Sequence, residues 1–276
     1  MAINPNLPAP FEFPLQVERF YAALISAVDA DFVPHAEPGL GGKLLYAGEL
    51  DAEARALLVA ANIAGAGSLA ATADAAAQKQ AIRDGVVDFL VTSLDEALRI
   101  LKNEIRKRET VAVCVALAPE TPEADFAREM LERGVLPDLV RPGAAGSAEG
   151  TGFLRQGALR VETAAPGESL ALLTWKVAAA PALWLPKLDA IALDSLSRDS
   201  SPAAFAARRW LRLAPRYLGR LGQGVRLLRC GEQTALRFLE RVERAEFGIP
   251  VEIQLSRRGE SVVYQFSPSA DSDSAG

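Results

Sequence analysis

The chain has 276 residues, of which 50% are hydrophobic and 24% charged, and its 30 basic and 35 acidic residues give a net charge of −5. This composition is that of an ordinary globular protein, and it excludes a collagen-like chain, a coiled coil, a disulfide-rich scaffold and wholesale disorder. The acidic balance also argues against a protein built mainly to coat nucleic acid.

The first 42 residues predict an arm, a helix and a loop. Residues 1–14 contain four prolines and are expected to be extended. From Pro14 to Val28, apolar residues recur at helical spacing, which predicts a helix. The Pro- and Gly-rich residues 35–42 predict a loop.

From residue 43 onward, short apolar runs alternate with helical patterns. Strands are predicted at 43–48, 68–74, 86–93, 110–117 and 136–140, and helices at 51–66, 75–85, 94–109 and 122–133. The run 110–117 is almost continuously apolar and β-branched, as a strand buried on both faces should be. This alternation is typical of an α/β fold, so we predict a Rossmann-like parallel sheet with helices on both faces.

The second half of the chain predicts a smaller α+β domain. Residues 143–152 are rich in Gly and Ala and predict a flexible loop. The elements expected after it are an antiparallel strand pair at 158–164 and 169–177, helices at 188–196 and 203–221 with an interruption at Pro215, a strand at 225–230, a helix at 233–247 and a hairpin of 251–256 with 261–266. The Ser- and Asp-rich residues 267–276 predict a disordered tail.

Features linked to cellular location predict a cytoplasmic protein. The N-terminus lacks the basic and apolar regions of a secretory signal, and the most hydrophobic stretch, 170–193, contains charged residues and prolines that disfavour a membrane span. Cys114 and Cys230 lie far apart in apolar surroundings. We expect reduced core thiols, with a disulfide as the alternative.

Several segments between residues 42 and 154 resemble, in order, the nicotinamide-binding domain of urocanase (urocanate hydratase). They are GKLLYAGEL at 42–50, AANIAGAGSLAATAD at 60–74, RDGVVDFLVTSLDEAL at 83–98, MLERGVLPDLV at 130–140 and GFL at 152–154. The resemblance implies a domain that holds NAD+, with the cofactor acting as an electrophile while water is added to urocanate. If the resemblance extends to function, this chain uses NAD.

Three parts of the urocanase pattern have no counterpart. The family's glycine-rich loop is replaced by GELDAEARAL at 48–57, in which Gly48 is the only glycine. The Thr-Ser-Ala-His-Asp motif that follows PDLV in the family is replaced by RPGAAGSAEG at 141–150. No segment corresponds to the family's cysteine-containing active-site region.

Carboxylates occupy the sequence positions where the glycine-rich loop would meet a pyrophosphate. Glu49, Asp51 and Glu53 stand at the predicted start of the first sheet-covering helix. A carboxylate about 5 Å from a phosphate charge costs about 3 kcal/mol at an effective dielectric of ~20, whereas a helix terminus returns only about 0.3–1 kcal/mol. The same acids are also favourable helix-start residues in their own right. We therefore expect no cofactor.

Few single residues qualify as site candidates. Gly48 and Asp74 are the candidate cofactor-binding residues, because Asp74 ends a strand where an acid would bind a ribose hydroxyl, although it also suits a helix cap. His35 is the only histidine, so any Ser-His-Asp or Cys-His device would need it. GLGGK at 39–43 precedes a strand, unlike a phosphate loop, and predicts a turn. No catalytic residue and no metal site are assigned.

Residues 205–229 contain seven arginines and no acidic residue. One helical stripe consists of Arg208, Arg212, Arg216 and Arg220, and a neighbouring one of Trp210, Leu213, Tyr217 and Leu221. The arginines form a candidate surface for a phosphate, an acidic partner or a nucleic-acid backbone. Alternatively, they pair with acids elsewhere in the fold, such as those at 49–53 or 240–246.

We expect a Rossmann-like domain at 41–142. The resemblance to urocanase implies that this domain is inserted into a discontinuous α+β domain made of 1–40 and 150–266. The preferred function is a urocanase-like protein without hydratase activity that acts by binding or self-association, with the apolar segment 180–193 as a homodimer contact. The alternative is a hydratase or oxidoreductase that uses NAD or another nucleotide through a rearranged loop. Nucleic-acid binding through the arginines is a third, minor hypothesis, and no membrane partner is expected.

Overall fold

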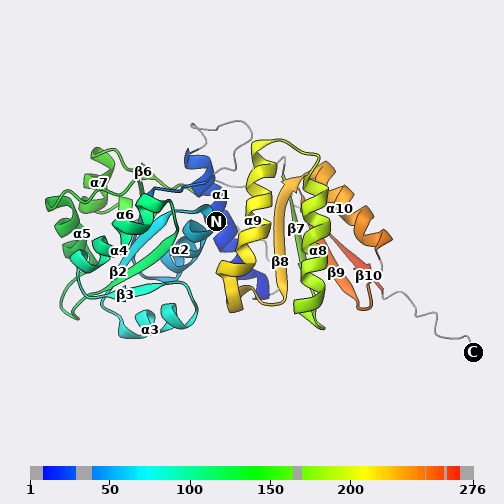
Figure 1. The fold of residues 1–276 in the computed structure, drawn as a ribbon, viewed down its shortest axis with the longest axis horizontal. Coiled ribbons are helices and arrows are strands. Elements are labelled where there is room, and N and C mark those ends of the chain that lie inside the picture. Colours follow the sequence, from blue (N-terminus) through cyan, green and yellow to red (C-terminus); the bar gives the residue numbers. More distant parts are fainter. Residues whose placement is uncertain (1–8, 29–38, 164–169, 246, 258–259, 268–276) are drawn as a thin grey trace, which may run out of the picture. The chain divides into compact units, whose positions relative to one another are not determined.

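The computed structural model describes residues 9–28, 39–163, 170–245, 247–257 and 260–267 (Figure 1). The chain divides into two compact units. Unit 1 comprises Met1–Glu12, Pro166–Pro215 and Gly222–Gly276, and unit 2 comprises Phe13–Ala165 and Arg216–Leu221. His35 and nearly all of the expected tail at 267–276 lie outside the described residues.

Unit 2 is built on a six-stranded parallel sheet with the strand order β3-β4-β2-β1-β5-β6. Its strands are β1 Leu44–Glu49, β2 Gly67–Thr72, β3 Phe89–Val91, β4 Val111–Ala116, β5 Leu139–Val140 and β6 Leu159–Arg160. The predicted parallel sheet is therefore confirmed, and β6 adds a strand beyond the five expected.

Helices cover both faces of this sheet. They are α2 Ala52–Ala64, α3 Ala75–Arg83, α4 Leu94–Lys107, α5 Glu123–Glu132, α6 Pro142–Ala145 and α7 Ala148–Arg155. Nearly all of α1 Glu12–Val28 also belongs to unit 2. Residues of α4, α5 and α7 share one apolar core with side chains of β1, β2 and β4. Helices α2 and α3 contact the sheet from its other face, as right-handed crossovers require (Figure 1).

Two expectations for the end of unit 2 are wrong. Residues 143–152 form α6 and most of α7 rather than a flexible loop, because Ser147 caps α7 by accepting a hydrogen bond from the Gly150 N–H at 2.9 Å. Residues 159–160 do not pair with the strand that follows them in sequence. They form β6, which lies parallel to β5.

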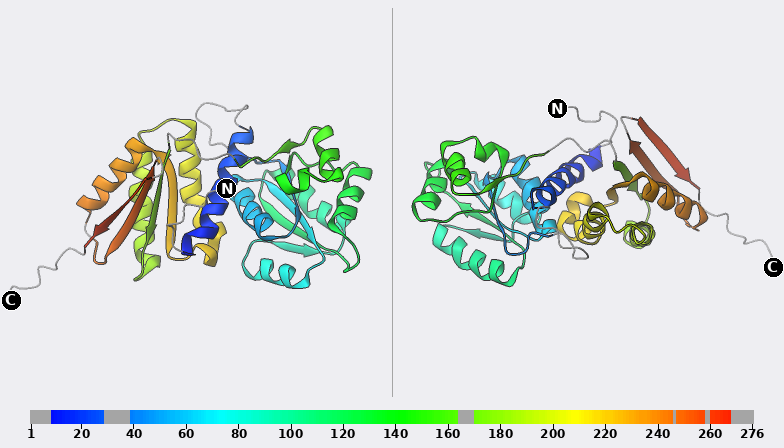
Figure 2. Two further views of the ribbon diagram at one scale, coloured as in Figure 1. Left: turned by 180° about the vertical axis from the view of Figure 1, so that it is seen from behind. Right: turned by 90° about the horizontal axis from the view of Figure 1, so that it is seen from above.

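Unit 1 contains a four-stranded antiparallel sheet with the order β10-β9-β7-β8 (Figure 2). Its strands are β7 Leu170–Lys176, β8 Val225–Gly231, β9 Val251–Arg257 and β10 Glu260–Phe266. The other elements are η1 Ala9–Phe11, α8 Pro181–Leu196, α10 Glu232–Arg244 and most of α9 Pro202–Leu218. The end of α9 from Arg216 onward and most of η3 Gly219–Gly222 belong to unit 2. The core includes Trp175 and Phe238, whose rings lie 5.1 Å apart.

Prolines in the helices of the second half act differently from expectation. Helix α8 begins at Pro181, seven residues before the predicted start, because proline at the first helical position loses no hydrogen bond. Helix α9 continues through Pro215 instead of breaking there. The buried neighbours Leu211, Ala214 and Leu218 hold that last turn in place, which offsets the missing N–H.

Cys114 and Cys230 are buried free thiols, as expected. Burial, with the nearby Glu49 charge, raises the pKa of Cys114 to about 12, and burial, with the Asp199 charge, raises the pKa of Cys230 to about 12. Among the described residues, no helix has the length and apolar character needed to cross a bilayer.

Candidate functional site

The candidate site lies at the carboxyl edge of the parallel sheet, between β1 and β5. The chain leaves β1 toward β2 on one side, whereas β5 lies on the other side of β1. Ligands of open α/β sheets bind at such a reversal of strand order, next to the start of the helix that follows the first strand. The residues that meet here are Gly48, Glu49, Asp51, Glu123 and Arg141.

Gly48 allows the chain to turn sharply at the end of β1. Its φ of +73° lies in the left-handed region, and the pairing of β1 with β2 shifts register between Tyr46 and Gly48. A Cβ atom at Gly48 would lie 3.1 Å from the Cβ of Ala144 in α6 and 3.5 Å from Oε1 of Glu123. The space beside this predicted cofactor-binding glycine is therefore occupied by the protein's own helix α6.

Asp51 and Arg141 close the start of α2. Asp51 is the N-cap of α2 and accepts a hydrogen bond from the Ala54 N–H at 2.8 Å. Arg141 directly follows β5, donates its backbone N–H to the Tyr46 carbonyl at 3.1 Å, and places Nη1 2.5 Å from Oδ1 of Asp51. Asp51 thus accepts from the helix N–H and from Arg141, as a bound phosphate otherwise would.

Arg141 is the residue of the candidate site that the sequence did not predict. It is only 7% exposed, and its Nε is buried without a hydrogen-bond partner among the described residues. The available signal was its position immediately after a strand that pairs with β1. Nothing local in RPGAAGSAEG pairs this arginine with a residue 90 positions earlier.

Two further carboxylates at this edge, Glu49 and Glu123, accept hydrogen bonds from hydroxyl groups. The Tyr46 hydroxyl donates to Glu123, which begins α5, and the Thr72 hydroxyl at the end of β2 donates to Glu49. Burial, and then the Glu123 charge, raise the pKa of Tyr46 well above its usual value. Burial also raises the pKa of Glu123, with a further contribution from Glu49, although the hydrogen bond from Tyr46 opposes the shift.

This shift predicts a pH-dependent stability. A carboxyl group whose pKa is higher in the folded than in the unfolded protein stabilises the fold at low pH, and that contribution is lost as pH rises above about 4.5 through the folded-state pKa. Glu123→Gln keeps a carbonyl acceptor for Tyr46 and removes the charge. The variant should therefore gain stability relative to the wild type as pH rises, measured by urea unfolding at pH 4.5 to 7.5.

A second variant checks the cause of that effect. Tyr46→Phe removes the hydrogen bond that opposes the shift of Glu123, so the pH dependence should become steeper. Parallel stability curves for the wild type and Glu123→Gln across this pH range would show that Glu123 carries no such linkage.

Asp74, the other candidate cofactor-binding residue, lies at the same edge but serves as a helix cap. Its carboxylate accepts hydrogen bonds from the N–H groups of Ala76 at 2.7 Å and Ala77 at 3.2 Å, at the start of α3. Its own N–H donates to the Thr72 hydroxyl at 3.1 Å. Its cofactor role stays a prediction that competes with this capping.

The arginine stripe is largely engaged within the protein. Arg208 donates to the carbonyls of Leu196 at 2.7 Å and Asp199 at 2.9 Å. Arg220 forms an ion pair of 2.9 Å with the buried Asp84. The guanidinium of Arg216 lies over the ring of Tyr217, and Arg212 also interacts within the chain. Asp84 lies outside 49–53 and 240–246, the acidic segments expected to pair with the arginines. The stripe as an anion-binding surface stays a prediction.

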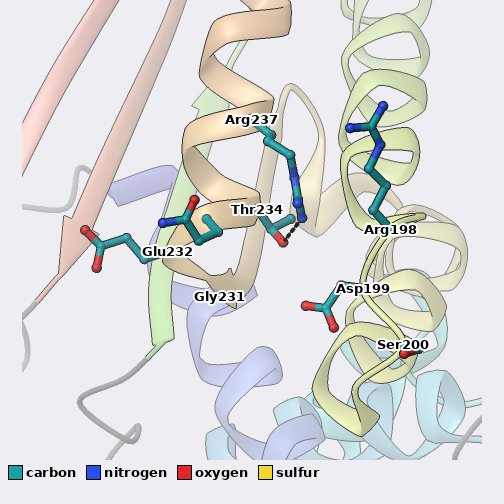
Figure 3. A pocket seen from close by; sticks show the side chains of 8 residues that line it. Arg198, Asp199, Ser200, Gly231, Glu232, Thr234 and Arg237 are labelled. Carbon is teal, nitrogen blue, oxygen red and sulfur yellow. Dashed lines mark hydrogen bonds between the residues drawn. The ribbon is translucent and has the colours of Figure 1, made fainter.

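Unit 1 contains an open polar pocket of about 480 Å³ between the end of α8 and the start of α10 (Figure 3). Arg237 on its wall donates to the Thr234 hydroxyl at 2.9 Å. The charged residues that line the pocket are Arg198, Asp199, Glu232 and Arg237. These charges balance, so they indicate neither an anionic nor a cationic ligand. In the part of the chain that the structure describes, no three His, Cys, Asp or Glu residues are grouped to hold a metal ion.

The family model of the urocanase Rossmann-like domain matches residues 23–165, more than half of the 276 residues. The chain belongs to the urocanase family. The match spans β1 to β6 and hence the whole parallel sheet of this urocanase-family protein, including the edge that carries Gly48 and Arg141. The four-stranded sheet of unit 1 lies outside the matched residues.

Proposed function

We propose that this urocanase-family protein neither holds NAD nor adds water to urocanate, and that it acts through binding or self-association. The observation that carries the proposal is the ion pair of Arg141 with Asp51 at the start of α2. Asp51 accepts the hydrogen bond from the α2 N–H that a pyrophosphate would otherwise accept. Helix α6 lies against Gly48, where the backbone would have to leave space for the pyrophosphate.

Charge opposes a nucleotide at this edge as well. Asp51 pairs with the buried Arg141, and Glu123 feels both the charge of Arg141 and that of Glu49. Each carboxylate about 5 Å from a phosphate charge would cost about 3 kcal/mol at an effective dielectric of ~20. A nucleotide that used Arg141 would first have to separate it from Asp51. The residues of this edge therefore do not fit the family's cofactor.

One observation favours the alternative of a nucleotide-dependent enzyme with a rearranged loop. The buried Nε of Arg141 has no hydrogen-bond partner among the described residues, and an unsatisfied guanidinium N–H is a donor that a phosphate oxygen satisfies well. Such an enzyme would need α6 to move from Gly48. We place this alternative second because Asp51 already supplies the counter-charge.

Release of cofactor from the purified protein decides between the two. We expect the full chain, denatured and examined by mass spectrometry, to release no stoichiometric NAD, and we expect urocanate absorbance to stay constant when the protein is added with or without NAD. A full-length urocanase treated identically is the positive control. Stoichiometric NAD in the sample, or consumption of urocanate, would refute the proposal and establish the alternative.

A further inference from the structure

Among the described edge strands of the two sheets, β10 is the long one whose outer edge is open, with no neighbouring strand. In unit 2, the edge strands β3 and β6 have only 3 and 2 residues. In unit 1, the β8 edge is covered, because the Trp210 indole donates to the Leu227 carbonyl at 2.7 Å and η1 contacts the strand. β10 has 7 residues and pairs with β9 alone among the described strands (Figure 2).

The side chains of β10 do not protect this edge. Exposed edge strands in monomeric proteins are usually guarded by lysine, proline or inward-pointing charge, because their unpaired N–H and C=O groups recruit other strands. The sequence of β10, ESVVYQF, contains no lysine, arginine or proline, and its one charge is at its first residue. Val262 is 47% and Val263 53% exposed, although successive residues point to opposite faces.

In the unit 1 sheet, the apolar face that is buried at β9 continues onto β10. Val251, Ile253 and Leu255 of β9 are buried, and their pairing partners in β10 are Phe266, Tyr264 and Val262. Cross-strand partners project to the same face of a sheet, so these three side chains extend the buried face outward. A further strand beside β10 would complete that face.

We infer that β10 pairs with β10 of a second copy of this chain, in antiparallel orientation about a two-fold axis at Val263. The inference rests on the proposed function, of which it names the self-association surface. The strand suits itself: this register sets Val262 against Tyr264, a β-branched residue against an aromatic one. It also sets Glu260 against Phe266, so the two glutamates lie at opposite ends and no like charges meet. The product is a continuous eight-stranded sheet, closed by two-fold symmetry.

The test measures molar mass by light scattering over a range of protein concentrations. The wild type should form a species of twice 29.4 kDa. Val263→Lys should weaken dimerisation at least about tenfold, because an edge lysine opposes strand pairing. Val263→Thr keeps a β-branched side chain and should remain dimeric. Leu183→Lys, at a residue 55% exposed in α8, is the matched control and tests the 180–193 contact.

Hydrogen exchange of the wild-type protein provides a readout that needs no variant. Amides of β10 should become more protected as the concentration rises through the dimerisation range. A monomeric wild type, a dimer unaffected by Val263→Lys, a dimer lost in Leu183→Lys, or open-ended larger assemblies would each overturn the inference. None of these outcomes bears on the retention of NAD, so the failure of this inference is distinguishable from failure of the proposed function.

Discussion

Replacing Arg141 with methionine should destabilise unit 2 by about 2 kcal/mol. Removing one partner of a buried ion pair costs about 3–5 kcal/mol, and an exposed ion pair contributes about 0–1 kcal/mol. This pair lies between the two cases, because Arg141 is buried whereas the Asp51 side chain is 49% exposed. Methionine keeps most of the length of the side chain but leaves Asp51 and Glu123 without their neighbouring buried cation. The loss is therefore electrostatic and specific to this edge of the sheet.

The readout must report on unit 2 itself. The three tryptophans, at 175, 184 and 210, all belong to unit 1, so their fluorescence would follow the wrong sheet. Hydrogen exchange of peptides from β1 and β2 measures the stability of the affected part directly.

Arg128→Met is the matched control for Arg141. Arg128 pairs with Asp125 at 2.8 Å and Glu149 at 3.4 Å, but its side chain is 54% exposed. Because exposed ion pairs contribute about 0–1 kcal/mol, this variant should lose little stability. Equal losses in the two variants would contradict the role given to Arg141.

Gly48→Ala should destabilise the same unit by about 2–3 kcal/mol. Holding an alanine at a φ of +73° costs about 1–2 kcal/mol. The added Cβ would also meet Ala144 at 3.1 Å, and such overpacking costs about 1 kcal/mol or more. The expected causes are the backbone strain and the close approach of α6, with no ligand involved.

Gly134→Ala separates the two contributions. Gly134 has a φ of +67°, and a Cβ added to it would meet no atom within 4 Å, so this variant should show the backbone strain alone. Adding Ala144→Gly to Gly48→Ala should restore the steric part, and a double-mutant cycle of stabilities measures it. If Gly48→Ala were no more destabilised than Gly134→Ala, α6 would not press on Gly48.

The elements of the parallel sheet were predictable because each carries its signal locally. The strand at 110–117 reads as a continuous apolar run because both of its faces are buried. Ser93 caps α4 through the Glu96 N–H, as the spacing of those two residues suggests. Both signals arise within one element, so no distant contact is needed to interpret them.

The predictions were wrong where contacts between residues far apart in the sequence determine the local structure. Residues 143–152 look like a loop by composition, but Gly152 provides the close approach that lets α7 pack on Leu131, whose Cδ1 would lie 2.7 Å from an added Cβ. The pairing of β6 with β5 was also not predicted, because a strand of 2 residues carries no periodic signal. Helix α9 passes through Pro215 because its neighbours are buried.

The sequence by itself determined that a parallel α/β sheet forms and that carboxylates replace the glycine-rich loop at the start of α2. Only the tertiary structure decided what balances those carboxylates. Arg141 reaches Asp51 across 90 positions because β5 lies beside β1, and α6 then covers Gly48. Strand order arises from the burial of whole elements against one another, so no short stretch of residues encodes it.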